Sequence, residues 1–445
     1  MMEHPSDAQP AVPLEEQPAS TVAHPPLMRD RSFWGMTATQ FLGAFNDNIF
    51  KQLMLLLAIP VGVTARTLDD EQGLATQIFS LPFILFSGYA GYLSDRFSKR
   101  RIIVLAKMAE ILIMLLGLVA FFSYDKSGHN ALLVVLFLMG TQSAFFGPGK
   151  YGILPEMLRE EDLPRANGII LMTTFLAIIF GTASAGMLGD LPVSRLWLGS
   201  LVCVAIAGVG TCTSLLIRPL PPAQPSLPFT WDTVFVPRDI RRLLRADWPL
   251  LQALLASCLF WMVSGLAIQA VNSLGLVQLG LNKTQTSIMT AIIGLGIAIG
   301  AVMAGKLCHG RADFRVVRGG AWGLVAALLL LSISLPGGKH LLGFQGSIPA
   351  LAFLGISAGF FAIPVQVFLQ TRAPAGLKGR MIATMNIANF FAIWFAGVLY
   401  ERFDSMLNAL HWPRSTTFAF MAALTLPVAL FYRPKDEGSG IKDQA

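Results

Sequence analysis

Long apolar segments recur along the whole chain, and each is about as long as a helix that crosses a lipid bilayer. The first runs from Phe33 to Pro60, and the last ends near residue 432. About 20 apolar residues are enough to span the hydrocarbon core. Of the 445 residues, 54% are hydrophobic and 13% are charged, about half the charged share of a soluble domain. We therefore expect an all-α, multi-pass membrane protein with about twelve transmembrane helices.

The apolar segments fall into two groups of six, with the longest polar gap between them. That gap begins with the Pro-rich RPLPPAQPSLP and continues as PRDIRRLLRADW, where Ile240, Leu243 and Leu244 share one helical face beside several arginines. This pattern predicts a short amphipathic, basic helix on the cytoplasmic membrane surface. A plain solvated linker is the alternative. The expected division is a tail (1–32), an N-terminal six-helix bundle (33–216), a linker (217–248), a C-terminal six-helix bundle (249–433) and a tail (434–445).

The basic residues predict the orientation of the chain in the membrane. Most of the 33 Lys and Arg residues fall in loops on the side of the two termini. Cytoplasmic loops carry this excess in membrane proteins, so both termini are expected in the cytoplasm. The net charge of +7 follows from that bias and does not indicate a nucleic-acid partner. Residues 1–32 are rich in Pro, Ala and acidic residues without an apolar core, which is typical of a disordered tail and not of a signal peptide.

The first apolar segment carries an unusual polar stretch, QFLGAFNDNIFKQ, from Gln40 to Gln52. A charge at the bilayer centre costs about 2.5–3.5 kcal/mol on insertion scales, so it is expected to face a cavity or a partner. Asp47 and Lys51 stand in the favourable i,i+4 order. We interpret this segment, with Asn46 and Asn48, as the lining of a polar cavity. The alternative is a structural Asp47–Lys51 pair that only holds helices together.

Other polar side chains inside the apolar segments are few. Amides could line the same cavity or could bond neighbouring helices; these candidates are Gln40, Gln142, Gln269, Asn272, Gln366, Gln370, Asn386 and Asn389. Lys107 and Glu110, three residues apart, could bind a headgroup, and a local ion pair near the membrane interface is the alternative. Lys150 in GPGKYG could receive a phosphate or anchor its helix at the interface.

The segment GYLSDRFSKRR, from Gly91 to Arg101, resembles the loop signature of the major facilitator superfamily. The resemblance assigns gating and folding roles to Gly91, Asp95, Arg96, Lys99 and Arg100. Gly91 lets helices approach closely, and Asp95 is expected at a helix N-terminus, where the dipole favours an anion. Ser98 stands where the family usually has Gly.

Four longer stretches resemble one branch, the bacterial lysophospholipid transporters. These are TQFLGAFNDNIFKQ, FFGPGKYGILPEM, RANGIILMTTFLAIIFGTASAGMLGD and GFFAIPVQVFLQTRA. The family has stand-alone members, as here, and members fused to acyltransferase and acyl-carrier-protein synthetase domains. The resemblance implies a flippase that moves lysophosphatidylethanolamine-type lipids from the outer to the inner leaflet of the bacterial inner membrane. It also implies a substrate role for Asp47.

One departure concerns the seventh segment, CLFWMVSGLAIQAVNSLG, which has no Arg where stand-alone transporters place a possible partner of the acidic residue. Lys51 is then expected as the partner of Asp47, with Gln269 and Asn272 supplying neutral hydrogen bonds. We expect a monomer that contacts membrane lipids and needs no cofactor or metal. A cytoplasmic acyltransferase could be its partner.

Alternatives of other kinds remain. A proton-coupled drug or metabolite exporter of the same superfamily also uses a membrane-embedded Asp. A non-transporting lipid-binding scaffold is the second alternative, because fold does not imply activity. An enzyme is not expected: an acyltransferase would show His-x4-Asp, and the nearest match, His309 to Asp313, is one residue too short.

Overall fold

The computed structural model is almost entirely helical. It describes residues 25–60, 70–124, 128–229, 236–308, 313–374 and 377–432. The expected tails lie mostly outside these ranges. The first described turn, η1 (Leu27–Arg29), leads into α1, whose N-terminus is capped by the Asp30 carboxylate through the Ser32 and Phe33 amides.

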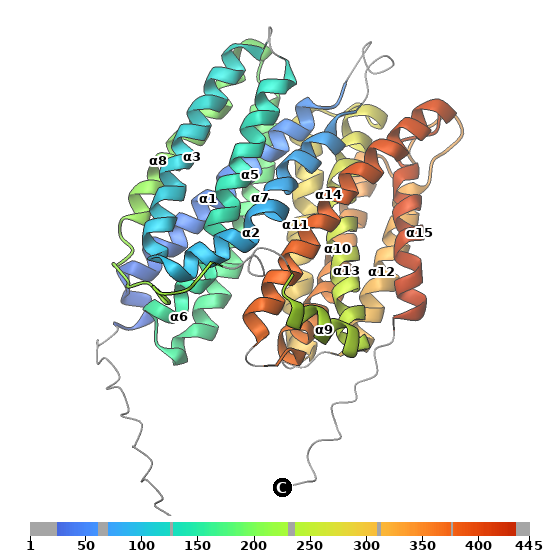
Figure 1. Ribbon diagram of the computed structural model, residues 1–445. Coiled ribbons are helices and arrows are strands. Elements are labelled where there is room, and N and C mark those ends of the chain that lie inside the picture. Colours follow the sequence, from blue (N-terminus) through green and yellow to red (C-terminus); the bar gives the residue numbers. More distant parts are fainter. Residues whose placement is uncertain are drawn as a thin grey trace, which may run out of the picture.

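Two groups of six long helices follow the order expected from the apolar segments (Figure 1). The first group comprises α1 (Arg31–Leu57), α2 (Gln72–Arg96), α3 (Lys99–Phe122), α5 (His129–Gly152), α7 (Leu163–Gly189) and α8 (Trp197–Ser214). Short turns join them: α6 (Leu154–Met157), η3 (Glu160–Asp162) and η4 (Val193–Arg195).

The second group begins after the linker helix α9 (Arg238–Ala246). It comprises α10 (Trp248–Ser273), α11 (Lys283–Cys308), α12 (Phe314–Ser332), α13 (Gly343–Arg372), α14 (Lys378–Leu410) and α15 (Thr416–Phe431). A π-helical stretch, Leu274–Gln278, extends α10 at its far end.

Membrane-spanning character agrees with this division. Among the described residues, ten helices are long and apolar enough to cross a bilayer. The other two helices of the bundles do not meet this criterion. In α1 the polar stretch lowers the hydropathy of the helix, and α15 has 16 residues. Leu, Val and Phe side chains exposed along the helices, such as Leu112, Val119 and Phe122 of α3, form the apolar outer surface that a bilayer would cover.

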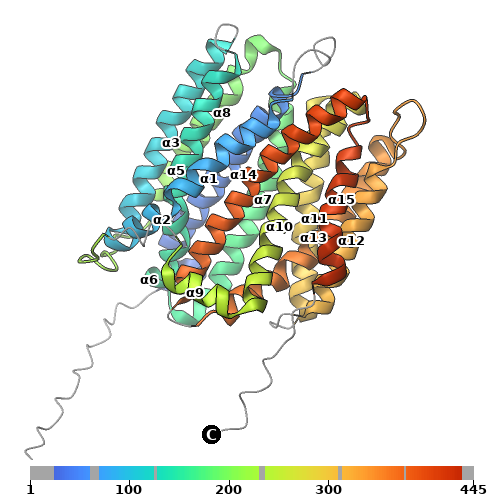
Figure 2. The same cartoon turned by 45° about the vertical axis from the view of Figure 1, so that its right-hand side comes forward.

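The two bundles stand side by side and meet through two helix pairs, α2 with α14 and α7 with α11 (Figures 1 and 2). Glycines allow the closest approaches, and they lie at the ends remote from α9. A Cβ on Gly73 of α2 would lie 2.5 Å from the Gly397 carbonyl oxygen of α14, and one on Gly186 of α7 would lie 2.6 Å from the Lys283 carbonyl oxygen. The bundles are therefore in tight contact at that end.

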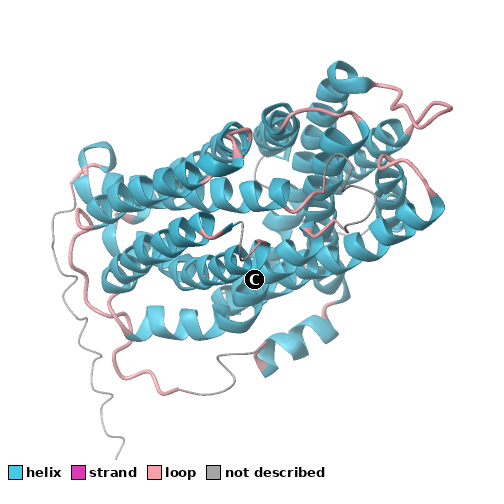
Figure 3. Ribbon diagram, turned by 90° about the horizontal axis from the view of Figure 1, so that it is seen from above, coloured by secondary structure: helices cyan, strands magenta, loops and turns pink. Residues whose placement is uncertain are grey.

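The linker attaches to both bundles on the opposite side. Its first part docks on the N-terminal bundle: the Gln224 amide donates to the Asp95 carbonyl (2.9 Å), and the Phe229 ring packs 5.3 Å from that of Tyr92. Its second part, α9, packs on the C-terminal bundle. Seen from above, the linker runs along one edge of the molecule (Figure 3).

The short helix in the linker forms as the sequence predicts, but its apolar side does not rest on lipid. Ile240 and Leu244 are buried in the core of the C-terminal bundle. Asp239 pairs with Arg380 near the start of α14, which fixes the helix sideways. The amphipathic helix therefore forms as predicted, and its apolar face is covered by the C-terminal bundle; its place at the membrane surface stays a prediction.

Candidate functional site

A cavity of about 1540 Å³ lies between the bundles and opens toward α9. Residues of both bundles line it, and linker residues such as Gln224, Leu227 and Arg242 stand at its mouth. At the other end the bundles are closed by the glycine contacts described above. The cavity is therefore accessible from one side of the molecule only.

Asp47 of α1 lies in the lining of this cavity, as its position in an apolar segment predicts. The Ser143 hydroxyl of α5 donates a 2.6 Å hydrogen bond to its Oδ2, and the Gln142 amide in turn donates to Ser143 Oγ (2.9 Å). Two buried oxygens in this group, Asp47 Oδ1 and Gln142 Oε1, have no hydrogen-bond partner within the described residues. The group can therefore accept further donors from a molecule in the cavity.

The expected ion pair between Asp47 and Lys51 does not form. In the described part of the chain no Lys, Arg or His nitrogen lies within 4 Å of the Asp47 carboxylate. Lys51 instead places its ammonium 5.3 Å from the centroid of the Phe79 ring of α2, a cation–π contact. Spacing along one helix permitted the pair, but the aromatic ring on a neighbouring helix gives the ammonium a different partner.

Lys107 and Glu110 of α3 form the local ion pair that the sequence offered as the alternative to headgroup binding. Both side chains are only 1% exposed and lie in the cavity wall. Asn46 of α1 donates to the other Glu110 oxygen at 2.6 Å. The Lys107 side chain fits between two glycines, since an added Cβ would lie 3.3 Å from its Nζ at Gly43 and 2.9 Å at Gly210. This buried pair joins α1, α3 and α8 beside Asp47.

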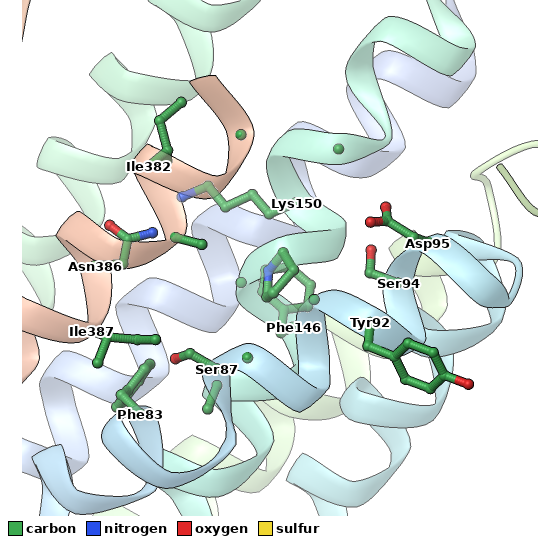
Figure 4. Close-up of a pocket in the computed structure, with 18 of the residues that line it drawn as sticks. Phe83, Ser87, Tyr92, Ser94, Asp95, Phe146, Lys150, Ile382, Asn386 and Ile387 are labelled. Carbon is green, nitrogen blue, oxygen red and sulfur yellow. The ribbon is translucent and has the colours of Figure 1, made fainter. Parts of the chain in front are cut away.

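A second polar chain connects α1, α5 and α7 closer to the mouth. The Lys150 ammonium donates to Thr174 Oγ1 (3.0 Å), Thr174 donates to Gln40 Oε1 (2.9 Å), and Gln40 donates to Thr173 Oγ1 (2.7 Å). Lys150 and Gln40 line the cavity. Figure 4 shows the Lys150 side chain reaching across toward Ile382 and Asn386 of α14. The Lys150 side chain therefore lies in the cavity, and a role as a helix anchor at the membrane interface does not fully describe it.

The opposite wall, from the C-terminal bundle, is largely apolar at the same depth. Its lining includes Trp261 of α10 and Ile382, Ile387 and Phe390 of α14. Phe390 stacks on Phe83 of α2, with ring centroids 3.9 Å apart. Asn386 is the predicted amide that this wall contributes. The charged side chains Asp47, Lys107, Glu110 and Lys150 thus all come from the N-terminal bundle, and the apolar side chains of α10 and α14 face them.

Gln269 and Asn272 do not supply hydrogen bonds to Asp47, contrary to expectation. Asn272 lies at the closed end, where it accepts from Gln52 of α1 (2.8 Å) and donates to Gln72 of α2 (3.0 Å). The Gln269 backbone carbonyl also accepts from Gln72 (3.3 Å). These residues join the two bundles instead of lining the cavity, because α10 turns this face toward the neighbouring bundle.

The closed end has a further polar cluster at Asp70, before α2. Its carboxylate accepts from the Tyr400 hydroxyl of α14 (2.8 Å) and from the Gln72 amide (3.0 Å). Burial is the main cause that raises the pKa of Asp70 above its usual 3.8. Asp190, after α7, caps the start of α11 through the Thr284 and Lys283 amides (2.9 and 2.8 Å).

The remaining amide candidates have local roles. Asn48 donates to the Ala44 carbonyl of its own helix (2.7 Å). Asn389 accepts from Ser257 (3.0 Å), which joins α14 to α10 within one bundle. Gln366 and Gln370 share an exposed face of α13 outside the cavity lining.

The loop motif divides between cavity mouth and bundle. Gly91, Asp95 and Lys99 are in the lining at the mouth, and Lys99 pairs with Glu156 at 2.5 Å and with Asp95 at 3.8 Å. Asp95 occupies the last turn of α2, not a helix N-terminus, because α2 continues to Arg96.

Both remaining arginines of the motif make contacts within the N-terminal bundle. Arg96 donates to the Tyr92 hydroxyl, and Arg100 donates to the Ile217 carbonyl (2.6 Å) just after α8. Within the described ranges, no three His, Cys, Asp or Glu side chains gather closely enough to hold a metal ion.

Comparison with known proteins identifies the family. The model of the Major Facilitator Superfamily matches residues 33–397. The chain belongs to the major facilitator superfamily. Its fold is that of solved superfamily members: a mutant of the nucleoside transporter NupG aligns with TM-score 0.68 at 13% identity, over 89% of this chain and 98% of that one. A bacterial homologue of the lysosomal transporter Spinster aligns with TM-score 0.63 at 14% identity, over 91% and 96%.

Among curated relatives, the lysophospholipid transporter LplT of Serratia proteamaculans (strain 568) is 27% identical over 386 residues, 83% of this chain and 88% of the relative. As a major facilitator, the chain is a secondary transporter and not an enzyme. A cavity open at one end and closed at the other is one end state of alternating access, in which two bundles rock about a central site.

Several residues of this major facilitator site were not expected from the sequence. Ser143 supports Asp47, Thr174 joins Gln40 to Lys150, and Gln72 and Tyr400 complete the closed end. Ser143 and Thr174 lie in apolar segments next to other polar residues, and this position could have indicated that they face the same cavity. The sequence around Tyr400 did not indicate its role, since a tyrosine near a helix end is also typical of a membrane interface.

Proposed function

We propose that the chain carries one-chain phospholipids of the lysophosphatidylethanolamine type from the outer to the inner leaflet of a bacterial inner membrane. The observation that most supports this proposal is the chemical difference between the two walls of the cavity. One wall presents Asp47, Gln142 and Lys150, and the other presents Trp261, Ile387 and Phe390. A molecule with a charged headgroup and a single acyl chain matches both walls at once, since each polar group finds a partner and the chain stays out of water.

The charges on the polar wall suit a zwitterionic headgroup. The Asp47 carboxylate, with one oxygen unbonded within the described residues, can accept the ethanolamine ammonium. Lys150 lies two helical turns from Ser143 on α5, about 10 Å toward the mouth at 1.5 Å per residue. It can hold the phosphate as a point charge.

The comparison with LplT supports the same substrate class. The relative's name assigns it lysophospholipid transport, and the two chains align over most of their lengths. The stretch 258–275 of the opposite bundle has no Arg, so the headgroup ligands proposed here, Asp47 and Lys150, both come from the N-terminal bundle. A lipid delivered to the inner leaflet would then be available to an acyltransferase on that side.

The proposal is tested in proteoliposomes with fluorescent lysophosphatidylethanolamine in the outer leaflet, by following its arrival in the inner leaflet. Wild-type protein should accelerate the transfer over empty vesicles, and Asp47→Asn should lose at least about tenfold of that rate, because one charge-assisted hydrogen bond to the ammonium contributes about 1.5–3 kcal/mol.

Asn48→Ala is the matched control, because Asn48 neighbours Asp47 but bonds only its own helix. It should transfer the lipid at nearly the wild-type rate. Transfer no faster than in empty vesicles would disprove the lipid proposal. Active efflux of a cationic dye by the same vesicles would then identify an exporter.

A further inference from the structure

Arginines form one continuous stripe along α9. Arg238, Arg241, Arg242 and Arg245 follow the i, i+3, i+4, i+7 spacing that places residues on one helical face. Together they line a separate surface pocket of about 260 Å³. The opposite face of the helix holds the buried Ile240 and Leu244. Packing on the C-terminal bundle therefore keeps the arginine stripe turned away from the bundle core, with Arg238 and Arg242 also at the mouth of the transport cavity.

Three arginines of this stripe have no carboxylate partner among the described residues. Asp239 is the acidic residue of α9, and Arg380 of α14 already pairs with it. Asp247, just beyond the helix, is paired with Arg372 at 2.6 Å. In the described part of the chain, Arg241, Arg242 and Arg245 are exposed and have no carboxylate within 4 Å. Their guanidinium groups are available to an external anion.

The position of α9 brings the stripe to the level of lipid headgroups. Trp248, which follows the helix at once, is 60% exposed, and Leu255 two turns further along α10 is exposed on the same side. An exposed Trp above an apolar stripe marks a membrane–water interface. Figure 3 shows the linker region at the edge of the molecule.

We propose that the α9 arginine pocket binds the phosphate headgroup of an anionic phospholipid from the leaflet on that side of the membrane. Guanidinium groups bind phosphate oxygens through paired hydrogen bonds, and a row of them fits a diester headgroup that carries net negative charge. The acyl chains would lie against the exposed face of α10 below Trp248. This lipid is held, not carried, so the inference is independent of the transported substrate.

Bound lipid would also steady the cavity mouth. Asp239 on α9 is tied to Arg380, and Arg380 is part of the mouth lining, as are Arg238 and Arg242. A lipid clamped on the arginine stripe would restrain α9 against α14 and hence the C-terminal side of the opening.

Native mass spectrometry of the purified full-length protein in detergent tests the inference. Phosphatidylglycerol should form a saturable adduct at lower concentration than phosphatidylcholine. The double variant R241Q/R245Q should weaken phosphatidylglycerol binding by at least about tenfold, since each basic residue near a lipid surface contributes about fivefold. Neither residue lies in the lining of the transport cavity.

The matched control is R101Q/R165Q, which removes two exposed arginines from the same side of the molecule but outside α9. It should bind phosphatidylglycerol as the wild type does. Unchanged binding by R241Q/R245Q, or an equal loss in the control, would overturn the inference. So would equal retention of the two lipids, or displacement of phosphatidylglycerol by an equal concentration of inorganic phosphate, which would make the pocket a site for free anions.

If R241Q/R245Q is not recovered as folded protein, R241K/R245K replaces it. Lysine keeps the charge but loses the bidentate geometry, so severalfold weaker binding is expected. Wild-type affinity in that variant would contradict recognition by the guanidinium groups.

Discussion

The side-chain amide of Gln52 in α1 donates a 2.8 Å hydrogen bond to Asn272 Oδ1 in α10, across the boundary between the two bundles. Asn272 also donates to Gln72 (3.0 Å) and accepts from Thr290 (3.1 Å), and all three partners are buried. One amide thus links α1 and α2 of the N-terminal bundle to α10 and α11. The bonds to Gln52 and Gln72 cross between the bundles and must break when the closed end opens, so their strength helps to set the balance between the two end states.

Replacing Asn272 by Ala should shift that balance toward opening of the closed end. Each hydrogen bond contributes about 0.5–1.5 kcal/mol, so losing the set should raise the open fraction by roughly tenfold or more. Spin labels at Val193 and Leu341, exposed residues of the two bundles at this end, report the change as a longer distance. Ser257→Ala, which breaks a bond within one bundle, should leave the distances unchanged.

Lys51→Gln should keep lysophosphatidylethanolamine transfer within about threefold of wild type. Lys51 contacts the Phe79 ring and is not in the lining of the cavity, so its replacement removes no group that the substrate would contact. Combined with Asp47→Asn, its effect should add to within the weak electrostatic coupling of two side chains that share no hydrogen bond or ion pair. A double variant no worse than Asp47→Asn alone would mean that the two side chains act as a pair after all.

Glu110→Ala should destabilise the protein strongly. It leaves the Lys107 ammonium buried without its carboxylate, a change that costs about 3–5 kcal/mol when both groups are buried. Thermal unfolding followed by size-exclusion chromatography measures the loss. The double variant Lys107→Met with Glu110→Gln removes both charges together and should recover most of the stability. Equal instability of the single and double variants would argue against a charge effect.

Lowering the pH should favour the state in which the end remote from α9 is closed, because Asp70 becomes protonated there. Burial, the largest cause, raises the pKa of this carboxyl in the closed state, whereas an open end would return it to about 3.8 in water. The closed state therefore binds the proton more tightly. Its advantage is present at low pH and is lost as the pH rises through the raised pKa.

The label distances at Val193 and Leu341 should accordingly shorten as the pH is lowered from neutral toward 3.8. Asp70→Asn should abolish that response. Asp190 acts in a lower window: burial alone would raise its pKa, but hydrogen bonds from Thr284 and Lys283 hold it below 3.8, so its cap is lost only below that pH. Distances that lengthen on acidification above pH 3.8 would contradict the assignment to Asp70.

The architecture could be predicted from the sequence because the physical constraint is one-dimensional. Segments of bilayer length must become helices, and a charge such as Asp47 must turn toward a polar cavity. The same reasoning located the short helix at Ile240 and Leu244. Its periodicity identified an apolar face but not whether lipid or protein would cover that face.

Pairing between helices could not be predicted in the same way. Lys51 lies one turn from Asp47, yet its neighbour is Phe79 of another helix, and the partners of Asn272 are about 200 residues away in the chain. The full burial of the Lys107–Glu110 pair could not be read from its position near a loop, because that position does not show which side of the helix faces the bundle. These details depend on how twelve helices pack together, which spacing within one helix does not encode.

The linker contacts both bundles and therefore restrains how far they can separate at the cavity mouth. Phe229 is held by Tyr92 on one bundle, and the chain reaches the other bundle again at Val236, which packs on its core. The seven peptide units between them span at most about 25 Å when fully extended, at roughly 3.6 Å each. That length is an upper limit on the separation of Phe229 and Val236, and it limits the opening of the cavity mouth for as long as both contacts hold. Shortening the segment would narrow the largest cargo the mouth admits without touching any residue that binds it.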